Sequence, residues 1–452
     1  MKICNPSTLE VIQEVTPDDK GEIEQKFKVL QKGQKAWAQQ ELVMRLECIE
    51  RFSSLLKQNT EDLAQKLSSE MGKPIQQARN EIIASRQRIE FFTENSAKWL
   101  MPHDVQVNEE IVETLVYEPL GVIANISAWN YPYLVGVNVF VPALIGGNAV
   151  VYKPSEYATL TGLAIQELLY EAGIPEDVFS SVIGAANEGE HLLDLPFDGY
   201  FFTGSVKTGK HIAERIAHKL VPLGLELGGK DPLYVTDDLE DIRLVAGNCV
   251  DGSFYNNGQS CCGVERIYVH QSIYEEFLDH FVDIAKELKM GNPFEEGIHQ
   301  GPLARSVHIP FLLDQIQDAK DKGARVLLGG NKINEIFLEP TILVNVDHTM
   351  KIMQEESFGP IIGIQKVTGD LEAIELMEDT AYGLTASVFS KDIARARGIL
   401  DKLNVGTAYI NCCDRVSPYL PWSGRKQSGL GSTLSYLGIL AFVQPKAYQI
   451  RS

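Results

Sequence analysis

Short apolar runs alternate with helical segments in the first half of the chain, and this alternation constrains the fold more than any other feature. Continuous apolar runs predict strands buried on both faces at residues 121–127, 148–152, 178–183 and 199–203. Between them, residues 159–172 and 188–193 have helical character, and Gly173 and Pro175 end the first of these helices. Strands that alternate with helices form βαβ units, so this region predicts a parallel sheet in an α/β domain.

A second alternating series follows Gly229. Strands are predicted at residues 233–236, 266–270, 361–367, 387–390 and 406–411, and helices at 274–289, 310–322 and 392–403. The chain therefore predicts two α/β domains joined near residues 227–230, and a cleft between such domains suits a cofactor. Before the first sheet, apolar spacing over residues 41–69 predicts one or two amphipathic helices, and alternation at 111–117 predicts a strand.

Composition restricts the function classes. The formal net charge of −20 argues against nucleic acid or an anionic membrane as the main partner. The apolar stretch 135–152 is broken by Asn138, Pro142 and two glycines, so a buried strand–turn–helix region is predicted rather than a membrane span. The seven cysteines have neither zinc-site spacing nor a disulfide pattern, and residues 1–10 do not resemble a signal peptide. We therefore expect a cytoplasmic protein with reduced thiols.

Three segments carry groups suited to covalent chemistry. Residues 257–262 (NGQSCC) place two thiols after a turn, where a thiolate could act as a nucleophile; buried, inert cysteines are the alternative. Residues 225–230 (LELGGK) place Glu226 between leucines, which suits a general base with a raised pKa; an ion pair with Lys230 is the alternative. Residues 129–132 (WNYP) hold Asn130 in a turn, where its amide could stabilise an oxyanion or satisfy the turn backbone.

Three further segments suit a nucleotide. Residues 202–205 (FTGS), followed by Gly209, lie between a predicted strand and a predicted helix, where glycines admit a phosphate; a tight turn is the alternative. Residues 152–156 (YKPSE) end a buried strand, where parallel sheets bind ligands, unless Lys153 and Glu156 form a solvated ion pair. Residues 355–360 (EESFGP) offer two acids and an aromatic ring before a turn, or form a polar loop.

In their order and spacing, WNYP, KPSE, FTGS, ELGGK, GQSC and EESFGP resemble the motifs of the aldehyde dehydrogenase superfamily. The resemblance runs nearly end to end, from residues 5–8 (NPST) to residues 421–429. It implies an α/β fold with two parallel-sheet domains, one dinucleotide-binding and one catalytic, and a small β oligomerisation arm. The implied division assigns residues 1–101 and 120–228 to cofactor binding, 229–427 to catalysis, and 102–119 with 428–452 to oligomerisation.

The resemblance also implies residue roles. Cys261 matches the nucleophile, Glu226 the general base and Asn130 the oxyanion donor, and no metal is required. The positions that match the site for NAD, with NADP as the alternative, are Trp129, Lys153, Glu156, Gly204, Ser205, Gly209, Leu227, Glu356 and Phe358. The implied reaction oxidises an aldehyde to a carboxylate through a thiohemiacetal and a thioester on the cysteine.

The implied substrate pocket consists of Tyr131, Tyr255, Cys262, Asp414, Arg415 and Trp422. Its aromatic members predict a medium-chain or aromatic aldehyde, provided that Asp414 and Arg415 neutralise each other. An inward, unpaired Arg415 would favour a semialdehyde such as succinic semialdehyde instead. Tyr131 and Trp422 match two walls of the aromatic cage found in relatives that oxidise trimethylammonium aldehydes, but Asn138 replaces a third wall.

Two other functions compete with this interpretation. A non-catalytic binding member of the fold could lose its chemical groups without cost to folding, so the presence of Cys261, Glu226 and Asn130 argues against it. An acylating enzyme would pass the thioester to coenzyme A, but such relatives typically lack the acid at the position of Glu226. The expected partners are a small aldehyde and further copies of this chain, as a homodimer or homotetramer.

Overall fold

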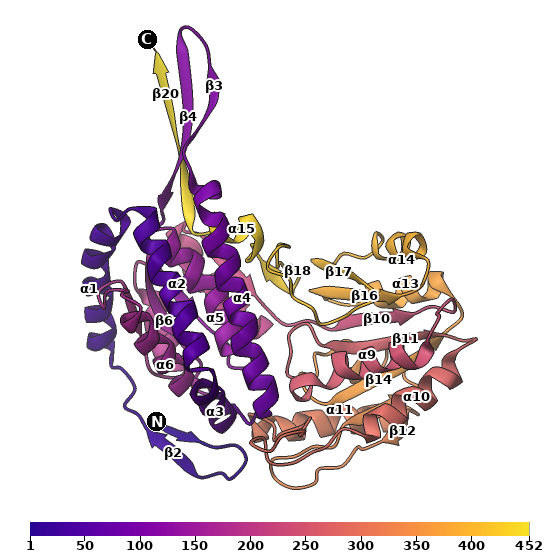
Figure 1. Ribbon diagram of the computed structural model, residues 1–452. Helices are drawn as coiled ribbons and strands as arrows, with labels where there is room; N and C mark the ends of the chain where they lie inside the picture. The colour runs from indigo at the N-terminus through magenta and orange to yellow at the C-terminus, as the bar shows by residue number, and fades with distance from the viewer. Residues whose placement is uncertain (452) are drawn as a thin grey trace.

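The computed structural model describes residues 1–451 and contains two large sheets, with a narrow three-stranded arm that projects from the molecule (Figure 1). The first sheet has the strand order β19-β9-β8-β5-β6-β7. Its strands are β5 (Val122–Ile126), β6 (Ala149–Lys153), β7 (Phe179–Ser181), β8 (Gly199–Thr203), β9 (Leu223–Glu226) and β19 (Gly429–Leu430). All neighbouring strands are parallel except β19 and β9.

Helices surround this first sheet. Those between its strands are α5 (Pro132–Ile145), α6 (Thr159–Glu171), α7 (Ala186–Asp194), α8 (Val206–Ile216) and the short η1 (Ala217–Lys219). The N-terminal part adds β1 (Lys2–Cys4), β2 (Val11–Glu14), α1 (Lys20–Ala38), α2 (Leu42–Gln58), α3 (Thr60–Met71) and α4 (Ile75–Leu100). The long helix α4 packs against α2, α3 and α5, which ties the N-terminal helices to the sheet.

The second sheet has the strand order β12-β13-β14-β11-β10-β16-β17. Its strands are β10 (Asp231–Val235), β11 (Val264–His270), β12 (Arg325–Leu328), β13 (Thr341–Val344), β14 (Ile361–Val367), β16 (Thr385–Phe389) and β17 (Thr407–Ile410). Only the edge strand β12 runs antiparallel to its neighbour. Its helices are α9 (Ile242–Phe254), η2 (Tyr255–Gly258), α10 (Tyr274–Lys286), η3 (Ser306–His308), α11 (Ile309–Asp321), α12 (Lys351–Gln354), α13 (Asp370–Glu378) and α14 (Ile393–Leu400).

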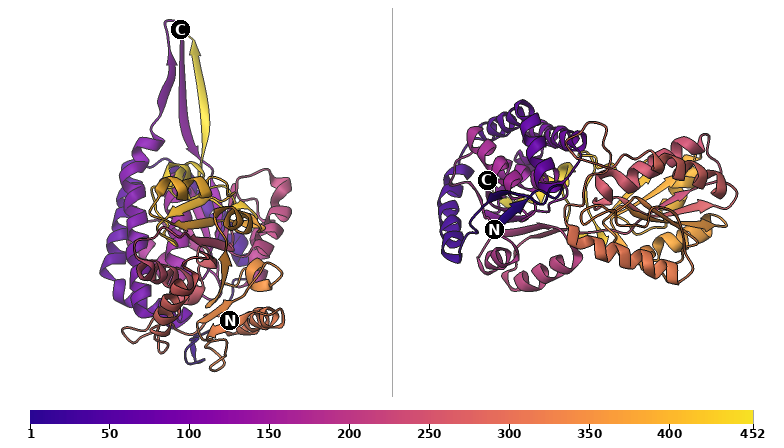
Figure 2. Two further views of the ribbon diagram at one scale, coloured as in Figure 1. Left: turned by 90° about the vertical axis from the view of Figure 1, so that its right-hand side faces the viewer. Right: turned by 90° about the horizontal axis from the view of Figure 1, so that it is seen from below.

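The C-terminal tail returns from the second sheet to the first. The short pair β15 (Tyr382–Gly383) and β18 (Arg425–Lys426) precedes β19, and α15 (Ser435–Leu440) then packs against α4 and α5. The last strand, β20 (Val443–Arg451), joins β4 (Ile111–Pro119) and β3 (His103–Val107) in the arm. Both views in which the arm is seen lengthwise show it extending well beyond the helices (Figures 1 and 2).

The predicted fold class is confirmed: the chain is an α/β protein with two mostly parallel sheets and small antiparallel sheets. One local prediction was wrong. The apolar region 135–152 is not strand–turn–helix, because its first part lies in α5 and the strand β6 follows the turn at Gly146 and Gly147. Every residue of α5 except Leu134 is buried, and an all-round buried helix loses the amphipathic period that distinguishes it from a strand.

The remaining predicted elements differ from the structure mainly at their ends. Residues 41–69 form two helices, α2 and α3, which meet at Asn59. The strand β8 has the predicted bounds, whereas β7 is shorter than the predicted strand at 178–183. Among residues 1–451, none of the helices combines the length and the apolarity needed to span a bilayer.

Candidate active site

Cys261 lies in a loop between η2 and β11 whose backbone has an unusual shape. Asn256 and Asn257 have φ angles of 53° and 57°, and Gly258 follows with φ 67°. Side-chain hydrogen bonds stabilise this backbone conformation. The Asn256 amide donates to the carbonyl oxygen of Asn130 at 3.2 Å and to the carbonyl oxygen of Gln259 at 3.1 Å. A Cβ on Gly258 would lie 2.3 Å from the Gly359 oxygen, so only glycine fits. The loop is therefore held in one shape beside Asn130.

The three residues predicted to be catalytic line a single cavity of about 480 Å³. Asn130 follows β5, Glu226 ends β9, and Cys261 precedes β11, so the two sheets contribute to one site. The Asn130 amide donates one hydrogen bond, to the Gln259 carbonyl at 3.1 Å, which leaves its second N–H for a ligand. Cys261 itself is partly exposed.

Glu226 stands at the boundary between two cavities. It lines the main cavity and also a second cavity of about 210 Å³, which is bordered by Thr433 of the C-terminal tail. The hydroxyl of Thr433 donates a hydrogen bond to Oε1 of Glu226. Burial raises the pKa of Glu226, and the hydrogen bond from Thr433 and the charge of Arg88 counteract part of that shift. These surroundings make Glu226 a stronger base than an exposed carboxylate, as a general base requires.

Cys262 differs from Cys261 in its surroundings. Its thiol is buried and donates to Oδ1 of Asp414 at 2.9 Å, and the hydroxyl of Ser260 donates to the same oxygen at 3.1 Å. A hydrogen bond with Cys261 and burial raise the pKa of Cys262 well above its usual value. Cys262 is therefore held as a neutral thiol, and it does not line the main cavity, whereas Cys261 does.

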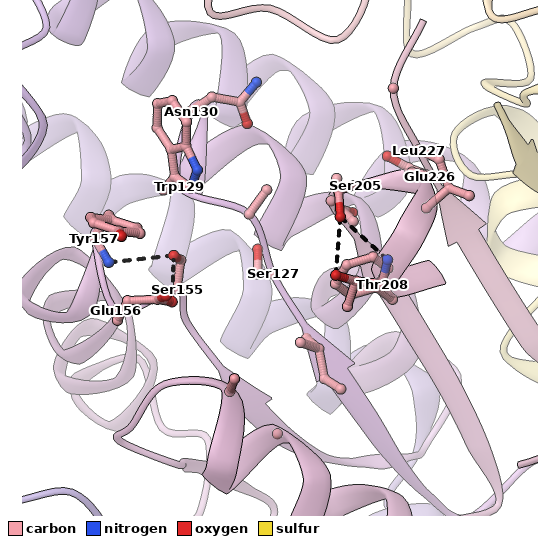
Figure 3. A pocket seen from close by; sticks show the side chains of 18 of the residues that line it. Ser127, Trp129, Asn130, Ser155, Glu156, Tyr157, Ser205, Thr208, Glu226 and Leu227 are labelled. Carbon is pink, nitrogen blue, oxygen red and sulfur yellow. Dashed lines mark hydrogen bonds between the residues drawn. The ribbon is translucent and has the colours of Figure 1, made fainter. Parts of the chain in front are cut away.

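The far end of the main cavity contains the groups predicted to bind adenosine and phosphate (Figure 3). Lys153 ends β6 and is buried, and burial lowers the pKa of its ammonium group. The hydroxyl of Ser155 donates to Oε2 of Glu156 at 3.1 Å. Across the cavity, Gly204 and Ser205 lead into α8, where the Ser205 hydroxyl caps the helix by accepting from the Thr208 N–H at 3.3 Å.

Close packing against Leu227 explains why residue 209 is a glycine. A Cβ on Gly209 would lie 2.6 Å from Cδ2 of Leu227, so the glycine allows α8 to approach the loop that follows β9. Leu227 lines the cavity, whereas Gly209 does not line it and instead packs against Leu227 from the other side.

The near end of the cavity is bordered by Glu356 and Phe358. Glu356 accepts from the Gly229 N–H at 3.2 Å, and burial raises its pKa to about 8. Phe358, with φ 51°, packs edge-to-face on Trp129 with 5.5 Å between ring centroids. Trp129 also approaches the ring of Tyr157.

These residues fit a dinucleotide. The N-terminus of α8 presents free N–H groups to an anion, buried carboxylates can accept from ribose hydroxyls, and aromatic rings border the path between them. Arg305 adds an orphaned donor: it lines the cavity, lies 5.1 Å from the Tyr157 ring, and its buried Nε has no hydrogen-bond partner among residues 1–451. Such a donor is satisfied by an anionic ligand.

Sequence reasoning missed several lining residues. Arg305, His308 and Phe311 come from η3 and α11, a region that carries no nucleotide motif. Tyr157 follows a recognised motif directly, so that motif could have indicated it. The other missed lining residues are Ile126, Ser127, Ala128, Ala185, Ala186, Gly189, Glu190, Leu193, Thr208, His211 and Ile212.

The predicted substrate residues lie outside the main cavity, and five of the six lie near the catalytic residues. Among the groups that act on half-buried Tyr131 are Asp414, Tyr255 and Cys262. Trp422 is buried and its backbone pairs with Thr433, the hydrogen-bond partner of Glu226.

Arg415 requires a correction. Its side chain is 69% exposed and pairs with Asp251 at 3.7 Å, so it neither lines an enclosed site nor forms an ion pair with Asp414. Asp414 has φ 47°, so the backbone is not extended here; its carboxylate points inward to Cys262 while Arg415 is exposed. The expected neutralisation of Asp414 by Arg415 is therefore replaced by hydrogen bonds from Cys262 and Ser260.

Comparison with known proteins identifies the family. The model of the aldehyde dehydrogenase family matches residues 1–448, so the chain belongs to this family. It is 34% identical to glutarate-semialdehyde dehydrogenase of Pseudomonas putida over 449 residues, 99% of this chain and 93% of that protein.

Two solved structures extend the comparison. Betaine aldehyde dehydrogenase of Staphylococcus aureus in complex with NAD+ superposes with a TM-score of 0.95 at 31% identity, covering 99% of this chain and 91% of that chain. An NADP-dependent enzyme of E. coli superposes with a TM-score of 0.96 at 29% identity, covering 100% and 94%. The chain is an NAD(P)-dependent aldehyde dehydrogenase.

Proposed function

We propose that the chain oxidises its aldehyde through a covalent thioester on Cys261. The observation that carries this proposal is that Cys261, Asn130 and Glu226 line one cavity together with the nucleotide-binding groups. The sulfur of Cys261, as thiolate, attacks the aldehyde carbon and forms a C–S bond. The oxygen that becomes negative accepts hydrogen bonds from the free N–H of the Asn130 amide and the backbone N–H of Cys261.

NAD(P), when bound, accepts the hydride that leaves this carbon, so that a thioester remains on Cys261. Glu226 then removes a proton from water as the water oxygen attacks the thioester carbon. The C–S bond breaks, the thiolate is restored and the carboxylate product leaves. Because its pKa is raised by burial, Glu226 is a stronger base than an exposed carboxylate, and its place between two cavities gives water a route to it.

The test is a kinetic panel. NADH formation is measured with aldehydes of different length and charge, with and without coenzyme A. The proposal expects turnover without coenzyme A and release of the free acid. Turnover that requires coenzyme A would indicate acyl transfer instead, and no turnover with any aldehyde would support a binding function.

We infer that NAD is preferred over NADP. Glu156, oriented by Ser155, would accept from the free 2′-hydroxyl of the adenosine ribose. A 2′-phosphate would face this carboxylate as a like charge, although Lys153 nearby weakens the repulsion. Seven of the nine predicted cofactor residues fall within the proposed cofactor-binding residues 1–101 and 120–228. Glu356 and Phe358 fall within the proposed catalytic residues 229–427, so the first sheet would provide most, not all, of the cofactor site.

We also propose that the arm joins copies of this chain into a homodimer or homotetramer. Its strands β3 and β20 expose Val105, Val107, Tyr448 and Ile450, and exposed apolar strands are suited to pairing with another copy. Deletion of residues 443–452 followed by light scattering tests this: the mass should fall to that of a monomer. An unchanged mass would remove the arm from the interface.

A further inference from the structure

Arg88 is a buried arginine without a carboxylate partner. It lies on α4, is only 7% exposed, and forms no ion pair among residues 1–451. One of its terminal nitrogens, Nη1, donates to Oδ1 of Asn138 at 2.8 Å and to the carbonyl of Leu134 at 3.3 Å. No carboxylate lies within ion-pairing distance of this buried charge, although Glu226 acts on it from farther away, so an arginine held in this way suits an anionic group that arrives with a ligand.

The guanidinium group of Arg88 has unused hydrogen-bond donors. Nε and Nη2 of Arg88 donate to no group of residues 1–451, and the amide nitrogen of Asn138 is likewise uncommitted. Arg88 and Asn138 therefore offer adjacent N–H groups, and a guanidinium edge with two free donors matches the two oxygens of a carboxylate.

The position of Arg88 links it to the reaction centre. Its charge lowers the pKa of Glu226, and Cys261 and Glu81 also lie close enough to act on Arg88. Its contacts Leu134 and Asn138 lie one helical turn apart on α5, the helix that begins directly after Asn130 and Tyr131. Arg88 is not among the residues that line the dinucleotide cavity; its hydrogen bonds place it against α5.

The other charged groups nearby are already committed. Lys73 pairs with Glu81 and donates to the Asn130 carbonyl at 2.8 Å. Asp414 accepts from Cys262 and Ser260, and burial raises its pKa. Of these groups, Arg88 is the one whose donors remain available. Arg305, whose Nε also has no partner among residues 1–451, lines the dinucleotide cavity.

We propose that Arg88, supported by Asn138, binds the anionic end of the substrate, and that the substrate is an aldehyde with a carboxylate at its far end. This inference rests on the proposed function of Cys261 and adds the substrate class. A medium-chain or aromatic aldehyde, as predicted from the sequence, would leave the guanidinium unpaired. An aldehyde with a cationic end would be repelled by it.

The experiment compares substrates of equal length. The ratio of kcat/KM for glutaric semialdehyde to that for pentanal is measured for the wild type, Arg88→Met and Arg88→Lys. We expect a wild-type ratio well above one and a loss of about 10- to 100-fold in Arg88→Met, mainly through KM. Arg88→Lys keeps the charge but loses the paired donors, so its ratio should be intermediate. Arg415→Ala removes an exposed arginine that pairs with Asp251; it is the matched control and should keep the wild-type ratio.

A second measurement does not depend on the folding of a variant. Glutarate, the dicarboxylate product, should raise the Tm of the wild-type enzyme more than pentanoate does at equal concentration. A wild-type ratio of one or less, or equal Tm shifts, would overturn the substrate class. An equal loss for both aldehydes in Arg88→Met would show that Arg88 acts on the charge of Glu226 or Cys261 instead. Failure of the proposed function looks different, because no aldehyde would then reduce NAD.

Discussion

The hydroxyl of Thr433 donates a hydrogen bond to the carboxylate of Glu226, which lies 207 residues earlier in the chain. The bond joins the C-terminal tail to the end of β9, and the adjacent pairing of β19 with β9 brings the tail into place. Because the bond stabilises the ionised carboxylate, it lowers a pKa that burial raises. The tail therefore adjusts the basicity of the proposed general base.

Removal of this hydroxyl should change the pH dependence. In Thr433→Val the pKa of Glu226 should rise further, so less of the base is ionised at a given pH and the ascending limb of kcat against pH moves to higher pH. At high pH the variant and the wild type should converge. Thr433→Ser, which keeps the hydroxyl, should retain the wild-type profile. An unshifted limb in Thr433→Val would mean that Glu226 does not control it.

The two adjacent cysteines should respond differently. Cys261→Ala should lower kcat by more than about 1000-fold, because no other group in the cavity can form the thioester. Cys262→Ala should keep most of the activity, since its thiol is held neutral beside Asp414 and takes no part in the proposed steps. NAD binding, measured by fluorescence, should survive in both variants. If the Cys261→Ala variant were active, Cys261 could not be the nucleophile.

Glu226→Gln should separate the two halves of the reaction. The amide cannot remove a proton from water, so thioester hydrolysis should slow by about 100- to 10,000-fold while attack and hydride transfer continue. Rapid mixing should show a burst of NADH equal to the number of active sites, followed by a slow phase. A steady-state rate equal to that of the wild type contradicts the role of Glu226.

Glu156 should govern the choice of cofactor. Glu156→Gln removes the negative charge that would face a 2′-phosphate, so kcat/KM for NADP should rise by about tenfold relative to that for NAD. Glu190 also lines the cavity but is paired with His211, so Glu190→Gln is a control that should leave the ratio unchanged. If the wild type already prefers NADP, Glu156 does not contact the ribose.

The local order of the fold could be predicted because it depends on neighbouring residues. The strand β8 and the helix α6 follow directly from an apolar run and from a helical period with a glycine stop. The helix α5 could not be predicted from its pattern, because its burial on all sides removes the polar face that reveals a helical period.

The same distinction applies to the site. Short motifs in the sequence were enough to select Cys261, Glu226, Asn130 and the nucleotide segments. The structure places these residues around one cavity. Arg88 and Thr433 belong to no motif. Their importance arises only when α4 packs on α5 and the tail pairs with β9.

The sequence by itself determined the alternation of strands and helices, the family resemblance and the chemical groups that can carry the reaction, since these reside in local patterns and residue types. Only the tertiary structure decided which charges are buried and which are exposed. It turned Arg415 outward to Asp251 and Asp414 inward to Cys262, and it left buried Arg88 without an ion pair among residues 1–451. The physical reason is that burial and pairing depend on segments that are distant along the chain and meet only in the folded protein.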